Sequence, residues 1–151
     1  IIGMGKIGAQ VAAIGHIMGM RIVTLATSKF SKNDFPVDKL SQSNLLSVSD
    51  VVSLHCPLND HTQNLVNRDF LRQMKRSSFL INTRRGGLIV EPDLALALAE
   101  GWIQGAALDV LSEEPPAKDH LLTQLPNCVI TPHSAWMAKE ARERLLNTST
   151  H

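Results

Sequence analysis

Three short segments in the second half of the chain bring together side chains that can hold a carboxylate and move a proton. They are residues 82–87 (Asn-Thr-Arg-Arg-Gly-Gly), 109–116 (Asp-Val-Leu-Ser-Glu-Glu-Pro-Pro) and 131–135 (Thr-Pro-His-Ser-Ala). Each follows a short apolar run that is typical of a strand. An arginine pairs with a carboxylate through its planar fork, and a histidine beside a carboxylate exchanges protons near neutral pH. The segments therefore predict a site that grips a carboxylate substrate and moves a proton beside it.

A glycine pattern near the N-terminus predicts a nucleotide-binding part of the same site. Gly3, Gly5 and Gly8 match G-x-G-x-x-G between an apolar stub and an amphipathic helix pattern, which is the context that the motif needs. We assign the tight turn to Gly3, the approach of a pyrophosphate to Gly5, and close packing of helix and strand to Gly8. The N–H groups of Lys6 and Ile7 would then face the phosphates.

The choice between NAD and NADP stays open. An Asp or Glu that binds the ribose 2′-hydroxyl of NAD is expected near position 26, where the chain instead has Ala26, Thr27, Ser28 and Lys29. Without the acid, a 2′-phosphate is not repelled, and Ser28 and Lys29 could bind it. In the other reading these residues are merely exposed in a loop, and NAD is still bound.

The hydrophobic pattern alternates strands with helices along the whole chain. Strands are expected at 1–2 (a stub), 21–25, 50–54, 79–81, 106–110 and 128–131, and helices at 6–18, 40–46, 67–74, 92–99 and 139–146, the last with Ser134 as its cap. Strands rich in Val, Ile and Leu with little alternation indicate burial on both faces. We therefore predict a Rossmann-type α/β fold, a doubly wound parallel sheet with helices on both faces. Its ligands would lie beyond the carboxyl ends of the strands, where the three opening segments fall.

The bulk composition favours an ordinary globular domain. The chain has 151 residues and a net charge of +1, which gives no argument for binding to nucleic acid or to a membrane. No apolar run approaches the roughly 20 residues of a membrane-spanning helix, and no signal-peptide pattern opens the chain. Cys56 and Cys128 are expected to be buried thiols of a cytoplasmic protein. The histidines outside the three segments are interpreted as structural or exposed residues: His16, His55, His61, His120 and His151. None of them has the His/Cys spacing of a zinc site.

The order and spacing of six motifs resemble those of the D-2-hydroxyacid dehydrogenases, and most closely the glycerate dehydrogenase (hydroxypyruvate reductase) group. The matching stretches run to about residue 146 and are 3–8, 53–58, 80–88, 105–110, 114–116 and 131–136. The resemblance implies hydride transfer between a nicotinamide cofactor and a small 2-hydroxy or 2-keto acid. Hydroxypyruvate/glycerate or glyoxylate is favoured because Trp136 and the Ala-Lys-Glu-Ala-Arg run at 138–142 are similar to that group.

The resemblance also implies catalytic roles. Arg85 would bind the substrate carboxylate, and His133 would be the general acid/base. Glu114 would orient His133 and favour its imidazolium form, with Glu113 as a solvated neighbour. Formate dehydrogenases of the superfamily have an amide at the position of Glu114, which argues against formate as the substrate.

Further cofactor contacts follow from the resemblance. Asp109 would contact the nicotinamide end, Cys56 and Pro57 would lie near the adenine side, and the remaining positions would line the cofactor: Thr62, Thr83, Arg84 and Ala135. Two residues depart from the family pattern. Arg84 replaces a small residue and could crowd the cofactor or add phosphate affinity, and Ser134 replaces a common Ile.

In the family that this chain resembles, a separate substrate domain precedes the first strand and follows the last helix. Here the first strand is a stub and the chain stops at His151. We therefore expect residues 1–151 to be a dinucleotide-binding domain whose substrate domain is absent, with weak or no turnover alone. The family also implies a homodimer. Two alternatives stay open: a dinucleotide-sensing module like the corepressors that share this fold, and a D-lactate, phosphoglycerate or phosphite dehydrogenase, which share the arginine, glutamate and histidine.

Overall fold

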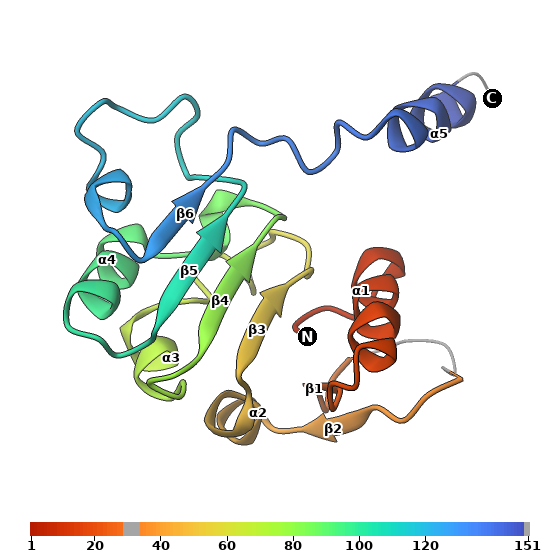
Figure 1. The fold of residues 1–151 in the computed structure, drawn as a ribbon, viewed down its shortest axis with the longest axis horizontal. Coiled ribbons are helices and arrows are strands. Elements are labelled where there is room, and N and C mark those ends of the chain that lie inside the picture. Colours follow the sequence, from red (N-terminus) through yellow and green to blue (C-terminus); the bar gives the residue numbers. More distant parts are fainter. Residues whose placement is uncertain (29–33, 150–151) are drawn as a thin grey trace.

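The fold is built on parallel strands. The computed structural model describes residues 1–28 and 34–149, and its ribbon is shown in Figure 1. A two-stranded sheet has the order β1-β2 and a four-stranded sheet the order β3-β4-β5-β6, with every pair parallel. The strands are β1 (Val23–Leu25), β2 (Asp38–Leu40), β3 (Val51–Leu54), β4 (Phe79–Asn82), β5 (Gly105–Leu108) and β6 (Cys128–Ile130).

The N-terminal stub joins the two sheets. The Ile2 N–H donates to the Ser53 carbonyl at 2.9 Å, and the Ile2 carbonyl accepts from the His55 N–H at 2.7 Å. On the other side, the Ile1 ammonium donates to the Val23 carbonyl at 2.8 Å. The order across the joined sheet is therefore β2, β1, the stub, β3, β4, β5 and β6, so the carboxyl ends of all strands lie along one edge. The predicted doubly wound α/β fold is confirmed.

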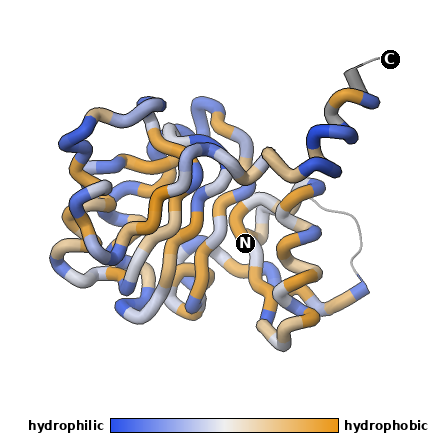
Figure 2. Tube along the Cα trace, turned by 45° about the horizontal axis from the view of Figure 1, so that its top comes forward, coloured by the Kyte–Doolittle hydropathy of each residue, from blue (hydrophilic) through white to orange (hydrophobic). Residues whose placement is uncertain are grey.

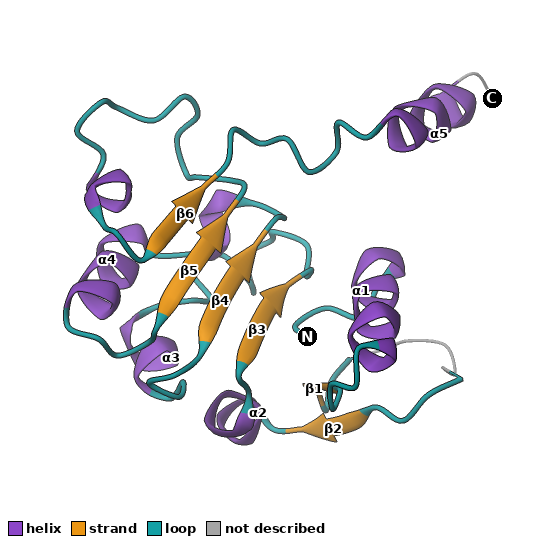
Figure 3. Ribbon diagram, in the orientation of Figure 1, coloured by secondary structure: helices purple, strands orange, loops and turns teal. Residues whose placement is uncertain are grey.

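Most helices lie between strands along the chain, and the last helix follows the final strand (Figure 3). They are α1 (Lys6–Ile17), α2 (Gln42–Val48), α3 (Arg68–Arg72), α4 (Glu91–Ala99) and α5 (Lys139–Ser149), with short 3₁₀ turns η1 (Gly86–Leu88) and η2 (Leu121–Gln124). The Ser41 side chain caps α2, and the Asn67 amide oxygen caps α3 by accepting from the Phe70 N–H at 3.1 Å. Polar caps of this kind satisfy amides that the first turn leaves unpaired.

Two apolar clusters stabilise these elements. The larger one joins α2, α3 and α4 to β3, β4 and β5 through fully buried side chains such as Leu45, Phe70 and Leu94. A smaller one lies under α1 and contains Met4, Ala12 and Ile22. Figure 2 shows apolar residues concentrated in the central strands. In the described part of the chain no helix is long and apolar enough to cross a membrane.

The structure differs from the sequence prediction in an unpredicted strand, a helix end and a helix cap. The polar stretch after β1 contains strand β2, which the sequence did not predict because its charged residues Asp38 and Lys39 are exposed, as is common in edge strands. Helix α3 ends at Arg72 rather than at 74. Helix α5 begins at Lys139, and Ser134 does not cap it, because the Ser134 N–H and hydroxyl both turn toward Asp109. The loop after β6 leads to α5, which lies apart from the other helices (Figure 1).

Candidate active site

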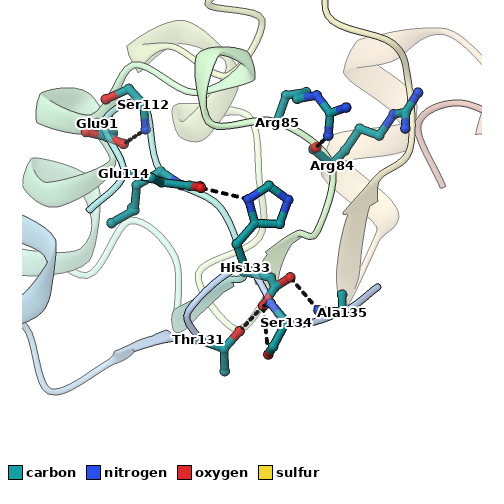
Figure 4. A network of polar contacts seen from close by, with 11 residues as sticks. Arg84, Arg85, Glu91, Ser112, Glu114, Thr131, His133, Ser134 and Ala135 are labelled. Atoms are coloured by element: carbon teal, nitrogen blue, oxygen red, sulfur yellow. Dashed lines mark hydrogen bonds and ion pairs between the residues drawn. The ribbon is translucent and has the colours of Figure 1, made fainter. Parts of the chain in front are cut away.

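His133 and Glu114 form a direct pair at the carboxyl edge of the sheet. His133 Nδ1 lies 2.7 Å from Glu114 Oε2, and the other oxygen of Glu114 accepts from the Leu111 N–H at 2.9 Å. The hydrogen bond from the His133 ring, and then the one from Leu111, lower the pKa of Glu114. Because an ionised carboxylate can only accept, Nδ1 must carry the proton of this bond. The second ring nitrogen, Nε2, then faces the side of Arg84 and Arg85 in Figure 4 and can exchange a proton with a bound molecule.

Asp109 fixes the backbone that carries His133. Its buried carboxylate accepts from the Thr131 hydroxyl at 2.5 Å, from the Ser134 N–H at 2.9 Å and from the Ala135 N–H at 2.8 Å. Burial alone would raise the pKa of Asp109, but these hydrogen bonds outweigh it, so the pKa is lowered. His133 has φ 51°, a left-handed conformation that is uncommon for residues other than glycine. This anchoring role of Asp109 was not predicted from the sequence, although Asp109 and Ala135 were both predicted as cofactor contacts.

Arg85 follows β4 and is exposed at the same edge. Its Nη1 donates to the Arg84 carbonyl at 2.7 Å, and its own carbonyl accepts from the side chain of Asn82 at 2.9 Å. Asn82 is fully buried and also accepts from the Arg84 N–H at 3.0 Å. Asn82 therefore sets the path of the chain through both arginines. Sequence reasoning missed it because it reads as the polar end of an apolar strand.

Gly86 brings Arg85 against the loop that carries Glu114. A Cβ at Gly86 would lie 2.0 Å from the carbonyl carbon and oxygen of Leu111 and 2.3 Å from the Ser112 nitrogen. No side chain fits there, because these neighbours are backbone atoms. A cavity of about 510 Å³ opens beside the pair and is lined by Asp109, Leu111, Glu114, Pro115, Pro116, Ile130, Thr131, Pro132 and His133.

The glycine turn has the geometry that its spacing predicts. Gly3 has φ +98°, and a Cβ on it would lie 2.3 Å from the Cys56 nitrogen, while a Cβ on Gly8 would lie 2.0 Å from the Gly3 carbonyl oxygen. Around Gly5 a Cβ would meet nothing within 4 Å. Gly5 precedes α1, and no side chain caps this helix end, so Lys6 and Ile7 present their exposed N-terminal amides to an open space. This arrangement fits the pyrophosphate of a dinucleotide.

The other predicted cofactor residues differ in how free they are to bind. Ser28 Oγ lies 3.0 Å from Thr24 Oγ1 and is thus drawn toward the strand, whereas Thr27 is exposed. Lys29 lies outside the described residues. The Thr62 hydroxyl donates to the Pro57 carbonyl at 2.6 Å, which ties the two predicted positions together. Thr83 is exposed at the end of β4.

Arg84 directs its charge into the space between β4 and the glycine turn. Its Nε is buried and has no hydrogen-bond partner in the described part of the chain. Burial is the largest influence on two neighbouring groups: it raises the pKa of Cys56 and lowers the pKa of His55. The positive charge of Arg84 makes a smaller contribution, which lowers the pKa of both groups. Cys56 is buried behind Gly3. The guanidinium is therefore placed where an anionic cofactor could lie.

In residues 1–28 and 34–149, no group of three or more His, Cys, Asp or Glu side chains is placed to hold a metal ion. The residues that the structure does bring together are Arg85, Glu114 and His133 on one side and Gly3, Gly5 and Gly8 on the other. Both groups lie at the carboxyl ends of the strands.

Comparison with known proteins identifies the family. Residues 1–135 match the family model described as D-isomer specific 2-hydroxyacid dehydrogenase, NAD binding domain. The chain is 42% identical over 147 residues to a glyoxylate reductase of Aeropyrum pernix, and 41% identical over 148 residues to a glycerate dehydrogenase of Methylorubrum extorquens. These matches cover 96% of this chain but only 44% and 45% of the two relatives.

Among solved structures, the acyclic imino acid reductase Bsp5 in complex with NADPH and D-Arg superimposes with a TM-score of 0.85 at 37% identity. That match covers 97% of this chain and 47% of the reductase. The chain therefore belongs to the D-isomer-specific 2-hydroxyacid dehydrogenase family, matches its NAD-binding domain, and spans about half the length of its relatives.

Proposed function

We propose that this chain is the cofactor-binding part of an oxidoreductase that transfers a hydride between NAD or NADP and a small 2-hydroxy or 2-keto acid, with hydroxypyruvate/glycerate or glyoxylate favoured. The observation that carries the proposal is the 2.7 Å contact between His133 Nδ1 and Glu114 Oε2, at the same sheet edge as Arg85. The names of the two relatives, glyoxylate reductase and glycerate dehydrogenase, support this substrate class.

The side chains divide the work of the reaction. Arg85 pairs with the substrate carboxylate and orients the adjoining carbonyl. His133 gives a proton from Nε2 to the carbonyl oxygen in the reductive direction and takes it back in the oxidative direction. Glu114, bonded to Nδ1, holds the ring orientation and balances the charge of the imidazolium. When bound, the nicotinamide supplies or accepts the hydride.

The glycine turn and Arg84 support binding of a dinucleotide beside this pair. The open space at Gly5 and the uncapped amides of α1 suit a pyrophosphate, and the Arg84 guanidinium adds a positive charge near Cys56. No acid follows β1, so a 2′-phosphate meets no repulsion at Ala26. An intact acid/base pair favours catalysis over the corepressor-like alternative.

The partners of this chain are part of the proposal. Relatives about twice as long support a separate substrate domain in the complete protein, and that domain would close the site over the substrate. Large apolar side chains are exposed on α1 and after β6, among them Ile17, Met18 and Trp136. Such surfaces are typical of contacts with another domain or another copy of the chain, which supports the proposed homodimer.

Steady-state assays of the full-length protein test the function. The protein is given NADH or NADPH with hydroxypyruvate, glyoxylate or pyruvate, and Arg85→Gln is compared with Arg76→Gln, an exposed arginine elsewhere on the surface. We expect turnover of at least one keto acid. Loss of a charged hydrogen bond of about 1.5–3 kcal/mol should lower kcat/KM roughly 10- to 150-fold in Arg85→Gln and leave Arg76→Gln unchanged. Absence of turnover with every combination would contradict the proposal.

A further inference from the structure

A second carboxylate–histidine pair lies behind the first and has no part in the mechanism above. Glu91, the first residue of α4, places Oε2 3.1 Å from His120 Nε2. The two side chains are only 10% and 12% exposed. A carboxylate rarely lies this deep without a specific set of hydrogen bonds.

The hydrogen bonds of this pair have defined directions. The Leu122 N–H donates to His120 Nδ1 at 3.4 Å, so Nδ1 is an acceptor and Nε2 carries the proton that His120 gives to Glu91. The other oxygen of Glu91 accepts from the Ser112 N–H at 2.7 Å. Glu91 therefore uses each oxygen for one donor, and both donors come from outside its own helix.

Those two donors bracket the segment that carries Glu114. Ser112 lies just before Glu114 and His120 lies just before η2, so Glu91 ties both ends of this loop to α4. Successive amides of the loop point to different carboxylates, because the Leu111 N–H donates to Glu114 while the Ser112 N–H donates to Glu91. Figure 4 shows Glu91 and Ser112 beside Glu114 on the side away from His133.

The same peptide is in close contact with Gly86. A Cβ there would lie 2.0 Å from Leu111 backbone atoms, so the loop cannot move closer to Gly86. Steric contact with Gly86 and the hydrogen bond to the Glu91 carboxylate therefore both restrict the Leu111–Ser112 peptide.

We propose that Glu91 and His120 are positioning residues that hold the Glu114 loop so that Glu114 meets His133 at hydrogen-bond distance. This inference rests on the proposed function, because it assigns to the second pair a role in the geometry of the acid/base pair. In this proposal the Glu91–His120 pair touches neither substrate nor cofactor, and it affects the reaction only through the position of Glu114.

An amide of the same shape cannot keep all the hydrogen bonds around Glu91. Gln presents one oxygen and one NH₂ group, so its oxygen can accept from the Ser112 N–H only if its NH₂ faces His120 Nε2. His120 would then have to carry its proton on Nδ1, which would set that proton against the Leu122 N–H. His120→Gln differs, because its amide can still donate to Glu91, whereas His120→Ala leaves one carboxylate oxygen buried without a donor.

The kinetic test uses these variants in the full-length protein, with Glu113→Gln as the matched control in the same loop. A misplaced catalytic group costs up to about 100-fold in rate, so Glu91→Gln and His120→Ala should lower kcat by roughly 10- to 100-fold. The dissociation constant of NADH should stay within about twofold of the wild type, and His120→Gln should recover most of the rate. If kcat of Glu91→Gln equals that of Glu113→Gln, or if kcat and NADH affinity fall together, the inference is wrong.

An NMR measurement tests this inference independently of the proposed function. With ¹⁵N-labelled histidine, the Nδ1–H proton of His133 reports its bond to Glu114 whether or not the protein turns over a keto acid. Glu91→Gln should shift this resonance and Glu113→Gln should not; an unshifted resonance would overturn the inference. If Glu91→Gln does not fold, the comparison of His120→Gln with His120→Ala tests the positioning role instead. Equal rates and equal His133 spectra in those two variants would contradict the inference.

Discussion

The cofactor side and the proton-handling side of the site are built by opposite means. Around the glycine turn, geometry depends on side chains that are missing: a Cβ on Gly8 would lie 2.0 Å from a backbone oxygen, while at Gly5 the space is open. Around His133, geometry depends on polar side chains that are buried, above all Asp109, which accepts from Thr131, Ser134 and Ala135. A short local motif is sufficient to build the glycine turn. The surroundings of His133 instead need hydrogen-bond partners that lie 22 to 26 residues apart in the chain.

The two halves of the site should therefore fail in different ways. Steric requirements in the glycine turn should affect cofactor binding, because the backbone must come close to the pyrophosphate. Hydrogen bonds around His133 should affect the reaction step, since they place the ring rather than the cofactor. Variants in the two regions should therefore separate cofactor affinity from turnover.

The largest effect is expected from filling the two closest backbone contacts. Gly8→Ala and Gly86→Ala each drive a Cβ to 2.0 Å from backbone atoms, and overpacking of this kind should lower the free energy of unfolding by about 3 kcal/mol or more. Urea unfolding measures this loss in both variants. Gly5→Ala, which meets nothing within 4 Å, is the control: it should retain its stability and lose affinity for NADH. A Gly5→Ala protein that binds NADH normally would place the pyrophosphate elsewhere.

Asp109→Asn should have the next largest effect. The amide keeps one acceptor but cannot receive donors on both sides, so the Ser134–Ala135 backbone loses an anchor, at a cost of about 1–3 kcal/mol in the free energy of unfolding. We expect kcat to fall while the dissociation constant of NADH changes little, and Thr131→Val should have the same effect in weaker form. Stopped-flow binding and steady-state rates distinguish the outcomes. A loss of NADH affinity equal to the loss of rate would instead support the predicted contact of Asp109 with the nicotinamide.

The pH dependence of stability should also come from the His133 side. The pKa of Asp109 is lowered from its ordinary 3.8, so the unfolded chain binds the proton more tightly than the folded one. The stabilisation is therefore complete above that ordinary value and is lost as the pH falls through the lowered folded value. Urea unfolding from pH 6 to about pH 3 should show a steeper decline for the wild type than for Asp109→Asn. Parallel curves would mean that Asp109 is not the group responsible.

Cofactor choice is expected to give the smallest change. Ala26→Asp places a carboxylate after β1, where it would accept from a ribose 2′-hydroxyl and repel a 2′-phosphate. The ratio of kcat/KM for NADH over NADPH should rise by about tenfold, equivalent to about 1.4 kcal/mol. Ala26→Asn is the uncharged control of similar size. An unchanged ratio in Ala26→Asp would show that the 2′ end of the cofactor lies away from this position.

The sequence was sufficient for the features that depend on local patterns. Gly3, Gly5 and Gly8 take the conformations that their spacing predicts, and the strand before each of the three polar segments is present, because apolar runs and glycine requirements are properties of short stretches. Arg85, Glu114 and His133 were predicted at one edge of the sheet from the family resemblance, and Glu114 and His133 are in direct contact in the structure.

Features that depend on distant partners were not predicted. Strand β2 exists because it pairs with β1, although its own residues are charged. Asn82 and Glu91 read as ordinary polar residues, and their role appears only when the fold brings the arginine segment and the Glu114 loop beside them. Ser134 was predicted as a helix cap because a serine before a helical pattern is a common start signal, but the nearby Asp109 carboxylate takes its N–H instead.

The most direct test of the role of His133 is His133→Gln in the full-length protein, with NADH affinity and kcat measured on the same preparation. We predict that kcat falls by about 10²- to 10⁴-fold, as expected for loss of a general acid/base, while the dissociation constant of NADH is unchanged, because the glycine turn does not depend on this ring. A variant that keeps its rate, or one that loses cofactor binding together with its rate, would contradict the assignment of His133 to the proton-handling side.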